Sequence, residues 1–173
     1  MSKIGIFYGP ELGSVAKVAG LISDIFGKDN TDLVLIKNTT VQQVLNYDNI
    51  IFGFSTIGKE VWNASRHDSD WDDFVPHLNK VDLLGKTIAM YCLGDHLQYP
   101  NNFVDALGWM NERLLKINAT VIGRVSVDGY RFNESEGAKN ALFYGLAIDE
   151  DNESDKTPAR VKSWVEQLKK QGF

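Results

Sequence analysis

Residues 3–19 read KIGIFYGPELGSVAKVA, and this stretch decides the fold. The apolar run Ile4–Tyr8 predicts a buried strand, Gly9 and Gly13 punctuate a turn, and a helical pattern begins at Ser14. Such a junction directs backbone N–H groups and the positive end of a helix toward one place, which favours a bound phosphate. The turn contains neither G-x-G-x-x-G nor G-x-x-x-x-G-K-[ST], so it supports neither a dinucleotide site nor a Walker-type ATPase. It predicts a compact site for a mononucleotide phosphate.

The composition is that of an ordinary globular protein. The chain has 173 residues, 43% of them hydrophobic, and we expect a single domain over residues 1–173. No apolar run is long enough to span a membrane and no leader pattern precedes the first strand, so we expect a cytoplasmic protein without membrane association. The lone Cys92 lies in an apolar run and is interpreted as a packed thiol. The net charge of −5 argues against nucleic acid as a partner and suits steering toward a basic protein.

Strand-like and helical patterns alternate along the chain. The strand-like runs are mostly continuous, as is typical of strands buried on both faces. The predicted strands are Ile4–Tyr8, Leu33–Ile36, Ile50–Phe54, Thr87–Leu93 and Thr120–Val127. The predicted helices are Ser14–Phe26, Val41–Leu45, Asp70–Leu78, Asn102–Leu115 and Pro158–Lys170, the last with Thr157 as N-cap and Trp164 in the core. This alternation predicts a doubly wound parallel sheet with a ligand at the carboxyl ends of its strands.

Three predicted loops lie at those carboxyl ends, namely residues 9–15, 55–71 and 94–102. The second carries Ile57, Trp62 and Trp71, and the third places Tyr99 in an exposed setting. Apolar or aromatic side chains on two sides of a slot suit a flat heteroaromatic ring, because stacking adds about 0.5–1.5 kcal/mol beyond burial. A phosphate site beside such a slot suggests flavin mononucleotide (FMN).

The whole chain resembles the flavodoxins of the long-chain type. The segments that carry the resemblance are KIGIFYG, SDWDDFVPHL, LLGKTIAMYCLGDHLQYPNNFVDALG, VDGYRF and FYGLAIDEDNESDKTPARVKSWVEQL, in this order. The resemblance implies a three-layer α/β/α fold whose five-stranded parallel sheet has the order 2-1-3-4-5. It also implies an insertion in the fifth strand, for which residues 129–139 are the candidate.

The resemblance also implies roles for individual residues. Tyr99 takes the position that stacks on the exposed flavin face, and Asp95 takes the one at the pyrimidine edge, where Leu93 and Gly94 supply backbone groups. Thr56 matches a threonine near the phosphate, and Ile57 matches the position at the inner ring face. Gly58 and Lys59 would lie near the ring nitrogen that is protonated on reduction, and Asn102 and Asp151 match positions near the pocket rim. Ser55 is a further residue expected to bind the cofactor. Judged from the residues alone, Tyr99 could equally be a loop aromatic before Pro100 and Asp95 a helix cap.

Residues 10–15 depart from the family's hydroxyl-rich pattern S/T-x-T-G-x-T. In this chain they are Pro10, Glu11, Leu12, Gly13, Ser14 and Val15. All three hydroxyl positions are lost, and Pro10 lacks an N–H, so Gly13 and Ser14 offer partial compensation. If each lost bond to the phosphate contributed about 1.5–3 kcal/mol, binding could weaken by several orders of magnitude. Lys17 or Lys59 could supply a counter-charge.

The stretch 58–70, GKEVWNASRHDSD, is longer than the family's usual tight loop. Its Trp62 is interpreted as folding over the ring in place of the missing inner aromatic, and a surface anchor for a partner is the alternative. His67 and His96 near the same rim are interpreted as solvated loop histidines. No histidine or cysteine pair has the spacing of metal ligands, so no metal site is expected.

Two hypotheses about function remain at this point. The leading one is a low-potential one-electron carrier, not an enzyme, in which a monomer carries non-covalent FMN from a flavin or ferredoxin/flavodoxin-type reductase to an acceptor with a basic docking face. Acidic residues support both the low potential and the steering of a basic partner. They are Glu60, Asp68, Asp70, Asp72, Asp73 and Asp95. The alternative is a flavodoxin-fold binding or regulatory module with weak, altered or lost FMN binding. An NAD(P)H-dependent reductase has no visible signature.

Overall fold

The computed structural model describes residues 3–55 and 69–173, and its centre is a parallel sheet. The strands of this sheet are β1 (Ile4–Tyr8), β2 (Thr31–Leu35), β3 (Asn49–Phe54), β4 (Thr87–Leu93), β5 (Thr120–Val121) and β9 (Leu146–Ile148). Their order is β2-β1-β3-β4-β5, with β9 also paired to β4. The doubly wound sheet with order 2-1-3-4-5 is therefore confirmed, and its last position is shared by two short strands.

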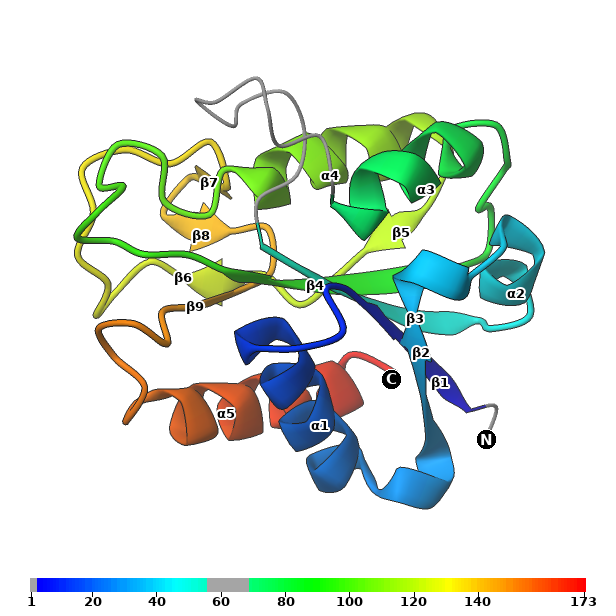
Figure 1. Ribbon diagram of the computed structural model, residues 1–173, viewed down its shortest axis with the longest axis horizontal. Coiled ribbons are helices and arrows are strands. Elements are labelled where there is room, and N and C mark those ends of the chain that lie inside the picture. Colours follow the sequence, from blue (N-terminus) through cyan, green and yellow to red (C-terminus); the bar gives the residue numbers. More distant parts are fainter. Residues whose placement is uncertain (1–2, 56–68) are drawn as a thin grey trace.

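Helices cover both faces of the sheet, as Figure 1 shows. Helices α1 (Ser14–Phe26) and α5 (Thr157–Lys170) lie on one face, and α3 (Asp70–Leu78) and α4 (Ala106–Lys116) lie on the other. The short α2 (Val41–Leu45) and the 3-10 turns η1 (Lys28–Asn30) and η2 (Ile36–Asn38) complete the connections.

Two apolar layers separate the sheet from these helices. Neighbouring residues of β1 point into different layers: Ile6 packs toward α1 and α5, and Phe7 packs toward α3 and α4. Both side chains are fully buried, as expected for a strand covered on both faces. Trp164 of α5 is 1% exposed, which confirms its prediction as a core residue.

The strand predicted over Thr120–Val127 is wrong in its second half. Strand β5 ends at Val121, and Val125–Ser126 forms β6 of a separate antiparallel sheet. The physical reason is Gly123, which has φ of 80° and therefore leaves the extended conformation. Its carbonyl accepts from Trp164 Nε1 at 2.8 Å and not from a neighbouring strand.

The chain leaves the main sheet after β5 and returns to it at β9. This excursion, residues 122–145, is wider than the expected insertion at 129–139 and contains β6, β7 (Ala138–Lys139) and β8 (Leu142–Phe143) in the order β6-β8-β7. Its place within the fifth sheet position agrees with the expectation. We call residues 122–145 the insertion.

Two predicted helix starts shift in the structure. Helix α4 begins at Ala106 and not at Asn102, because the preceding residues form turns in which Val104 has φ of 51°. Helix α5 begins at Thr157, so Lys156 is the N-cap and Thr157 is not.

Candidate functional site

Three chain segments come together at the carboxyl end of β3: the strand itself, the loop after β1 and the first turn of α3. The carbonyl of Gly53, near the end of β3, accepts a hydrogen bond from Gly9 N at 3.2 Å and another from Trp71 Nε1 at 3.0 Å. Gly9 begins the loop after β1, and Trp71 lies in the first turn of α3. One carbonyl thus fixes the loop after β1 and the first turn of α3 at the sheet edge where a ligand is expected.

The loop between β1 and α1 is exposed and leads into a helix start with unpaired donors. Gly13 has φ of 94°, and a Cβ there would meet nothing within 4 Å, so backbone conformation is what favours glycine. Helix α1 has no side-chain cap. Within residues 3–55 and 69–173, neither the Ser14 hydroxyl nor the N–H groups of residues 13–15 donate a hydrogen bond. These donors suit an anion.

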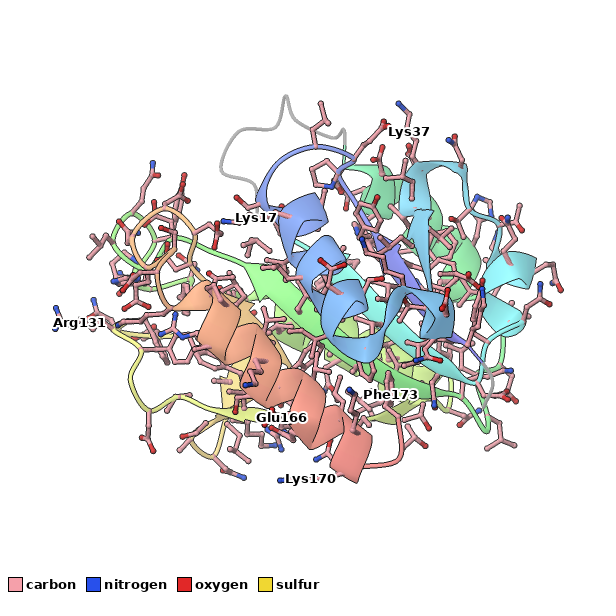
Figure 2. The ribbon with its side chains drawn as sticks, turned by 90° about the horizontal axis from the view of Figure 1, so that it is seen from below. Lys17, Lys37, Arg131, Glu166, Lys170 and Phe173 are labelled. Carbon is pink, nitrogen blue, oxygen red and sulfur yellow. The ribbon has the colours of Figure 1, made fainter. Side chains whose placement is uncertain are left out.

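Charged side chains near this helix start are arranged differently from the expectation. Lys17 does not face the loop as a free counter-charge, because its ammonium pairs with Glu150 in the β9–α5 loop. Figure 2 shows Lys17 pointing from α1 toward that loop. Burial opposes ionisation of Glu150, but the bond from Lys17 helps hold the pKa of this carboxyl below its usual value.

The first part of the loop after β4, residues 94–99, is shaped by the Asp95 carboxylate. Its Oδ1 accepts from Leu97 N at 3.0 Å, from Gln98 N at 2.8 Å and from Asn152 Nδ2 at 2.8 Å. The first two bonds close a tight turn, and the third ties this turn to the β9–α5 loop. We call residues 94–105 the ring loop.

A second, fully buried carboxylate holds the same two loops together. Asp149, directly after β9, accepts from the backbone N–H groups of His96 at 2.9 Å, Asn152 at 2.9 Å and Asp151 at 3.1 Å. The His96 ring also contacts it through Nδ1. His96 is only 6% exposed, so its interpretation as a solvated loop histidine is wrong. Burial opposes ionisation of Asp149, but bonds from Asn152 and His96 hold its pKa below the usual value.

Tyr99 presents its ring at the surface of the ring loop. The side chain is 49% exposed, while its backbone is fixed by Tyr99 N donating to Asp95 O at 3.0 Å and Asn102 N donating to Tyr99 O at 3.2 Å. The N–H of Gly94 donates to Ile148 O at 2.9 Å and so completes the sheet, which leaves it unavailable as a ring donor. Packing explains this glycine, because a Cβ there would approach Val104 to 2.9 Å.

The insertion supports the ring loop from behind. Pro100 O accepts from Asn133 N at 2.7 Å and Glu134 N at 3.1 Å, and Glu136 N donates to Asp105 Oδ1 at 2.7 Å. The Ser135 hydroxyl donates to Phe103 O. Phe103 packs in an aromatic cluster with Tyr130, Phe132 and Phe143 of the insertion.

Comparison with known proteins identifies the family. A family model described as Flavodoxin matches residues 6–164. The chain belongs to the flavodoxin family. It is 41% identical over 167 residues to a flavodoxin of Nostoc sp., covering 96% of this chain and 95% of the relative. It is 36% identical over 169 residues to flavodoxin 1 of Salmonella typhimurium, covering 97% and 93%.

Solved flavodoxin structures have the same fold. The Fusobacterium nucleatum flavodoxin bound to flavin mononucleotide superposes with a TM-score of 0.86 at 27% identity and covers 99% of both chains. Flavodoxin 2 of Bacillus cereus, at 21% identity and a TM-score of 0.68, shares the fold over 98% of this chain and 99% of that one.

The structure brings together part of the site expected from the flavodoxin resemblance. The loop from Pro10 to Val15, the end of β4 at Leu93 and the ring loop with Asn102 lie at the same carboxyl edge of the parallel sheet, and Asp151 lies on the loop after β9. Ser55 follows β3, and its carbonyl accepts from Cys92 Sγ at 3.4 Å. Thr56, Ile57, Gly58, Lys59, Trp62, Glu60, His67 and Asp68 lie outside the described residues.

Trp71 does not contribute to a ring slot. It is 1% exposed and packs edge-on against Phe52, Phe54 and Phe74 in the core. The helical spacing of Trp71, Phe74, Val75 and Leu78 is a signal that could have revealed this burial.

The acidic first turn of α3 lies beside the beginning of the loop after β1. Asp70, Asp72 and Asp73 occupy the first turn of α3, where a helix favours negative charge. A Cβ built on Gly9 would lie 3.5 Å from Asp70 Oδ2, so this carboxylate stands beside the loop after β1.

Residues 3–55 and 69–173 contain neither the features of a metal centre nor those of a membrane span. Over this part of the chain, no three histidine, cysteine or acidic side chains are grouped so that they could hold a metal ion. The same residues contain no helix with the length and apolar character needed to cross a membrane.

Proposed function

We propose that this protein is an electron carrier that holds FMN non-covalently at the carboxyl ends of β1, β3 and β4. The observation that carries the proposal is that the uncapped start of α1 and the half-exposed Tyr99 of the ring loop follow parallel strands and lie at the same carboxyl edge of the sheet. The relative from Fusobacterium nucleatum, which has the same fold, has a structure with flavin mononucleotide bound.

The chemistry of these donors fits FMN. The N–H groups of Gly13, Ser14 and Val15, with the Ser14 hydroxyl, would hold the phosphate, because phosphate oxygens accept hydrogen bonds and the helix dipole favours negative charge. Tyr99 would stack on the ring, and Asp95 would accept from the ring's edge. When bound, FMN would supply the one-electron chemistry, while the protein provides orientation and electrostatics.

The side chains of this site would affect the reduction potential of the flavin and its exposure to water. Asp70 and Asp95 add negative charge on two sides of the pocket, which makes further negative charge unfavourable and lowers the reduction potential. Tyr99 would shield one ring face from water. The described residues need donate no proton and form no covalent bond, which supports a carrier and not an enzyme.

Partner proteins follow from the same charges. We propose a flavin or ferredoxin/flavodoxin-type reductase as donor and an acceptor with a basic docking face, because acidic residues around the site would steer basic surfaces toward it. Asp70 stands beside the loop after β1, Asp95 lies on the loop after β4, and Asp151 lies on the loop after β9. A single-domain monomer in the cytoplasm completes the proposal.

The test is an absorption spectrum followed by titration of the apoprotein with FMN and with riboflavin, monitored by flavin fluorescence. We expect a flavin spectrum and quenched fluorescence on FMN binding. Tyr99→Ala should weaken binding of both flavins, whereas the control Leu115→Ala removes a similarly exposed apolar side chain at the opposite end of the sheet and should leave binding unchanged. If neither flavin bound at micromolar concentration, the protein would instead be a flavodoxin-fold binding module.

A further inference from the structure

Tyr91 joins the middle of the sheet to the start of α1. It lies on β4, on the face covered by α1 and α5, and is fully buried. Its hydroxyl donates to the carbonyl oxygen of Val15 at 2.8 Å. Val15 is the second residue of α1, so the bond reaches the first helical turn.

The space for this tyrosine is made by a glycine. A Cβ on Gly53 of β3 would lie 2.0 Å from Tyr91 Cζ and 2.1 Å from its hydroxyl oxygen, so the ring occupies the place where any other side chain would begin. Burying a hydroxyl without a partner is costly, which the Val15 carbonyl prevents. Burial raises the pKa of Tyr91 well above its usual value, so the hydroxyl remains a donor over the whole physiological pH range.

The bond acts on the helical turn whose N–H groups would face a phosphate. The Val15 carbonyl and the Ala16 N–H belong to one peptide plane, so holding the carbonyl fixes the turn of α1 that also contains the N–H groups of Ser14 and Val15. Residues 10–13 before it are exposed, and Gly13 contributes its carbonyl to Lys17 N at 3.1 Å. The loop lacks threonine hydroxyls, so phosphate binding would depend on the placement of backbone donors.

We infer that Tyr91 is a positioning residue for the phosphate end of FMN, acting through the Val15 carbonyl. This inference rests on the proposed function. The Tyr91 hydroxyl contributes to the binding of the phosphate, and the ring loop contributes to the binding of the flavin ring.

The test compares two flavins on two matched variants. Tyr91→Phe keeps the ring beside Gly53 and removes only the hydroxyl. Loss of one hydrogen bond corresponds to a roughly three- to tenfold weaker affinity for FMN, whereas riboflavin, which has no phosphate, should change less than about twofold. Tyr130→Phe is the control, because it removes a similar hydroxyl that donates to Ala147 O at 2.7 Å, remote from α1. It should leave the FMN-to-riboflavin affinity ratio unchanged.

The outcomes separate the two proposals. Wild-type protein that binds neither flavin would overturn the proposed function and this inference with it. Wild-type binding combined with an unchanged affinity ratio in Tyr91→Phe would overturn the inference alone, whether both affinities fell equally or neither changed. Urea unfolding of the apoproteins shows separately how much the hydroxyl contributes to overall stability.

Discussion

Asp149 is the residue whose substitution should affect the site most through the protein's own contacts. In Asp149→Asn, the Oδ1 atom can still accept from Asp151 N and Asn152 N, but an amide NH₂ replaces the oxygen that now accepts from His96 N. The His96 ring can still pair with the new amide, but the His96 backbone N–H and the Asn152 amide, which both donate to this oxygen, are left facing another donor.

The magnitude follows from these bonds. An unsatisfied buried donor costs about 1–3 kcal/mol, and the remaining bonds each weaken because the acceptor is no longer charged. The side chain of Asp149 is fully buried, so water cannot replace the lost partner. We therefore expect unfolding free energy to fall by about 2–4 kcal/mol, a large part of the typical 5–15 kcal/mol.

The assay is urea unfolding of the apoprotein, followed by tryptophan fluorescence. The matched control is Asp151→Asn, an exposed carboxylate two residues away, which should change stability by less than about 0.5 kcal/mol. FMN affinity of Asp149→Asn should also fall, because Asp149 anchors the loop that carries Asp95 and Tyr99. A loss below about 1 kcal/mol would show that Asp149 does not anchor these loops.

Three further predictions concern the core and its carboxylates. Gly53→Ala should lower the free energy of unfolding by about 3 kcal/mol or more, because its Cβ would lie 2.0 Å from Tyr91 Cζ. In the Tyr91→Ala background the same substitution should lower it much less, and equal losses in both backgrounds would disprove the steric cause. Burial raises the pKa of Cys92 far above its usual range, so a thiol reagent at pH 8 should modify it only after unfolding, and rapid reaction of the native protein would contradict this. Burial opposes ionisation of Glu153, but bonds from Lys156 and Arg160 hold its pKa below the usual value, as the bonds to Asp149 do for that carboxyl. Both groups therefore stabilise the fold above their unfolded pKa values of about 3.9 and 4.3 and lose this effect as pH falls through the lower folded values. The melting temperature should drop below about pH 4, and a flat profile from pH 7 to 3 would argue against this.

The sequence predicted those elements whose signal is local. The bounds of β1, α1, α2, α3 and β4 agree with the predicted ranges, because each is a continuous apolar run or a periodic pattern ended by polar residues or glycine. The fifth sheet position was not predictable in this way. Its two parts, β5 and β9, are short, and their pairing with β4 is decided by tertiary contacts.

The candidate site was predictable in outline and not in its internal bonds. The strand-end rule placed the loop after β1 and the ring loop at one edge. The burial of His96 depends on Asp149, 53 residues away, and the engagement of Lys17 depends on Glu150, 133 residues away. Neither pair has a spacing that a local pattern could reveal. The residues of the insertion that hold the ring loop were missed for the same reason.

The pairing registers of β5 and β9 with β4 show how the insertion is connected to the sheet. Val121 pairs with Ile88, and Leu146 pairs with Tyr91. Continuing both registers by one residue places Ile122 opposite Ala89 and Gly145 opposite Met90. Joining Ile122 directly to Gly145 would therefore give one continuous strand with no slip in its pairing.

Excision of residues 123–144 would thus be neutral for the hydrogen-bond ladder of the sheet. It would nevertheless remove the donors to Pro100 O and the aromatic partners of Phe103. The strand pairing would continue across the deletion, and the loop that carries Tyr99 would lose its packing against the insertion. The insertion therefore adds nothing to the pairing of the sheet strands, and its hydrogen bonds and aromatic contacts act on the loop that carries Tyr99.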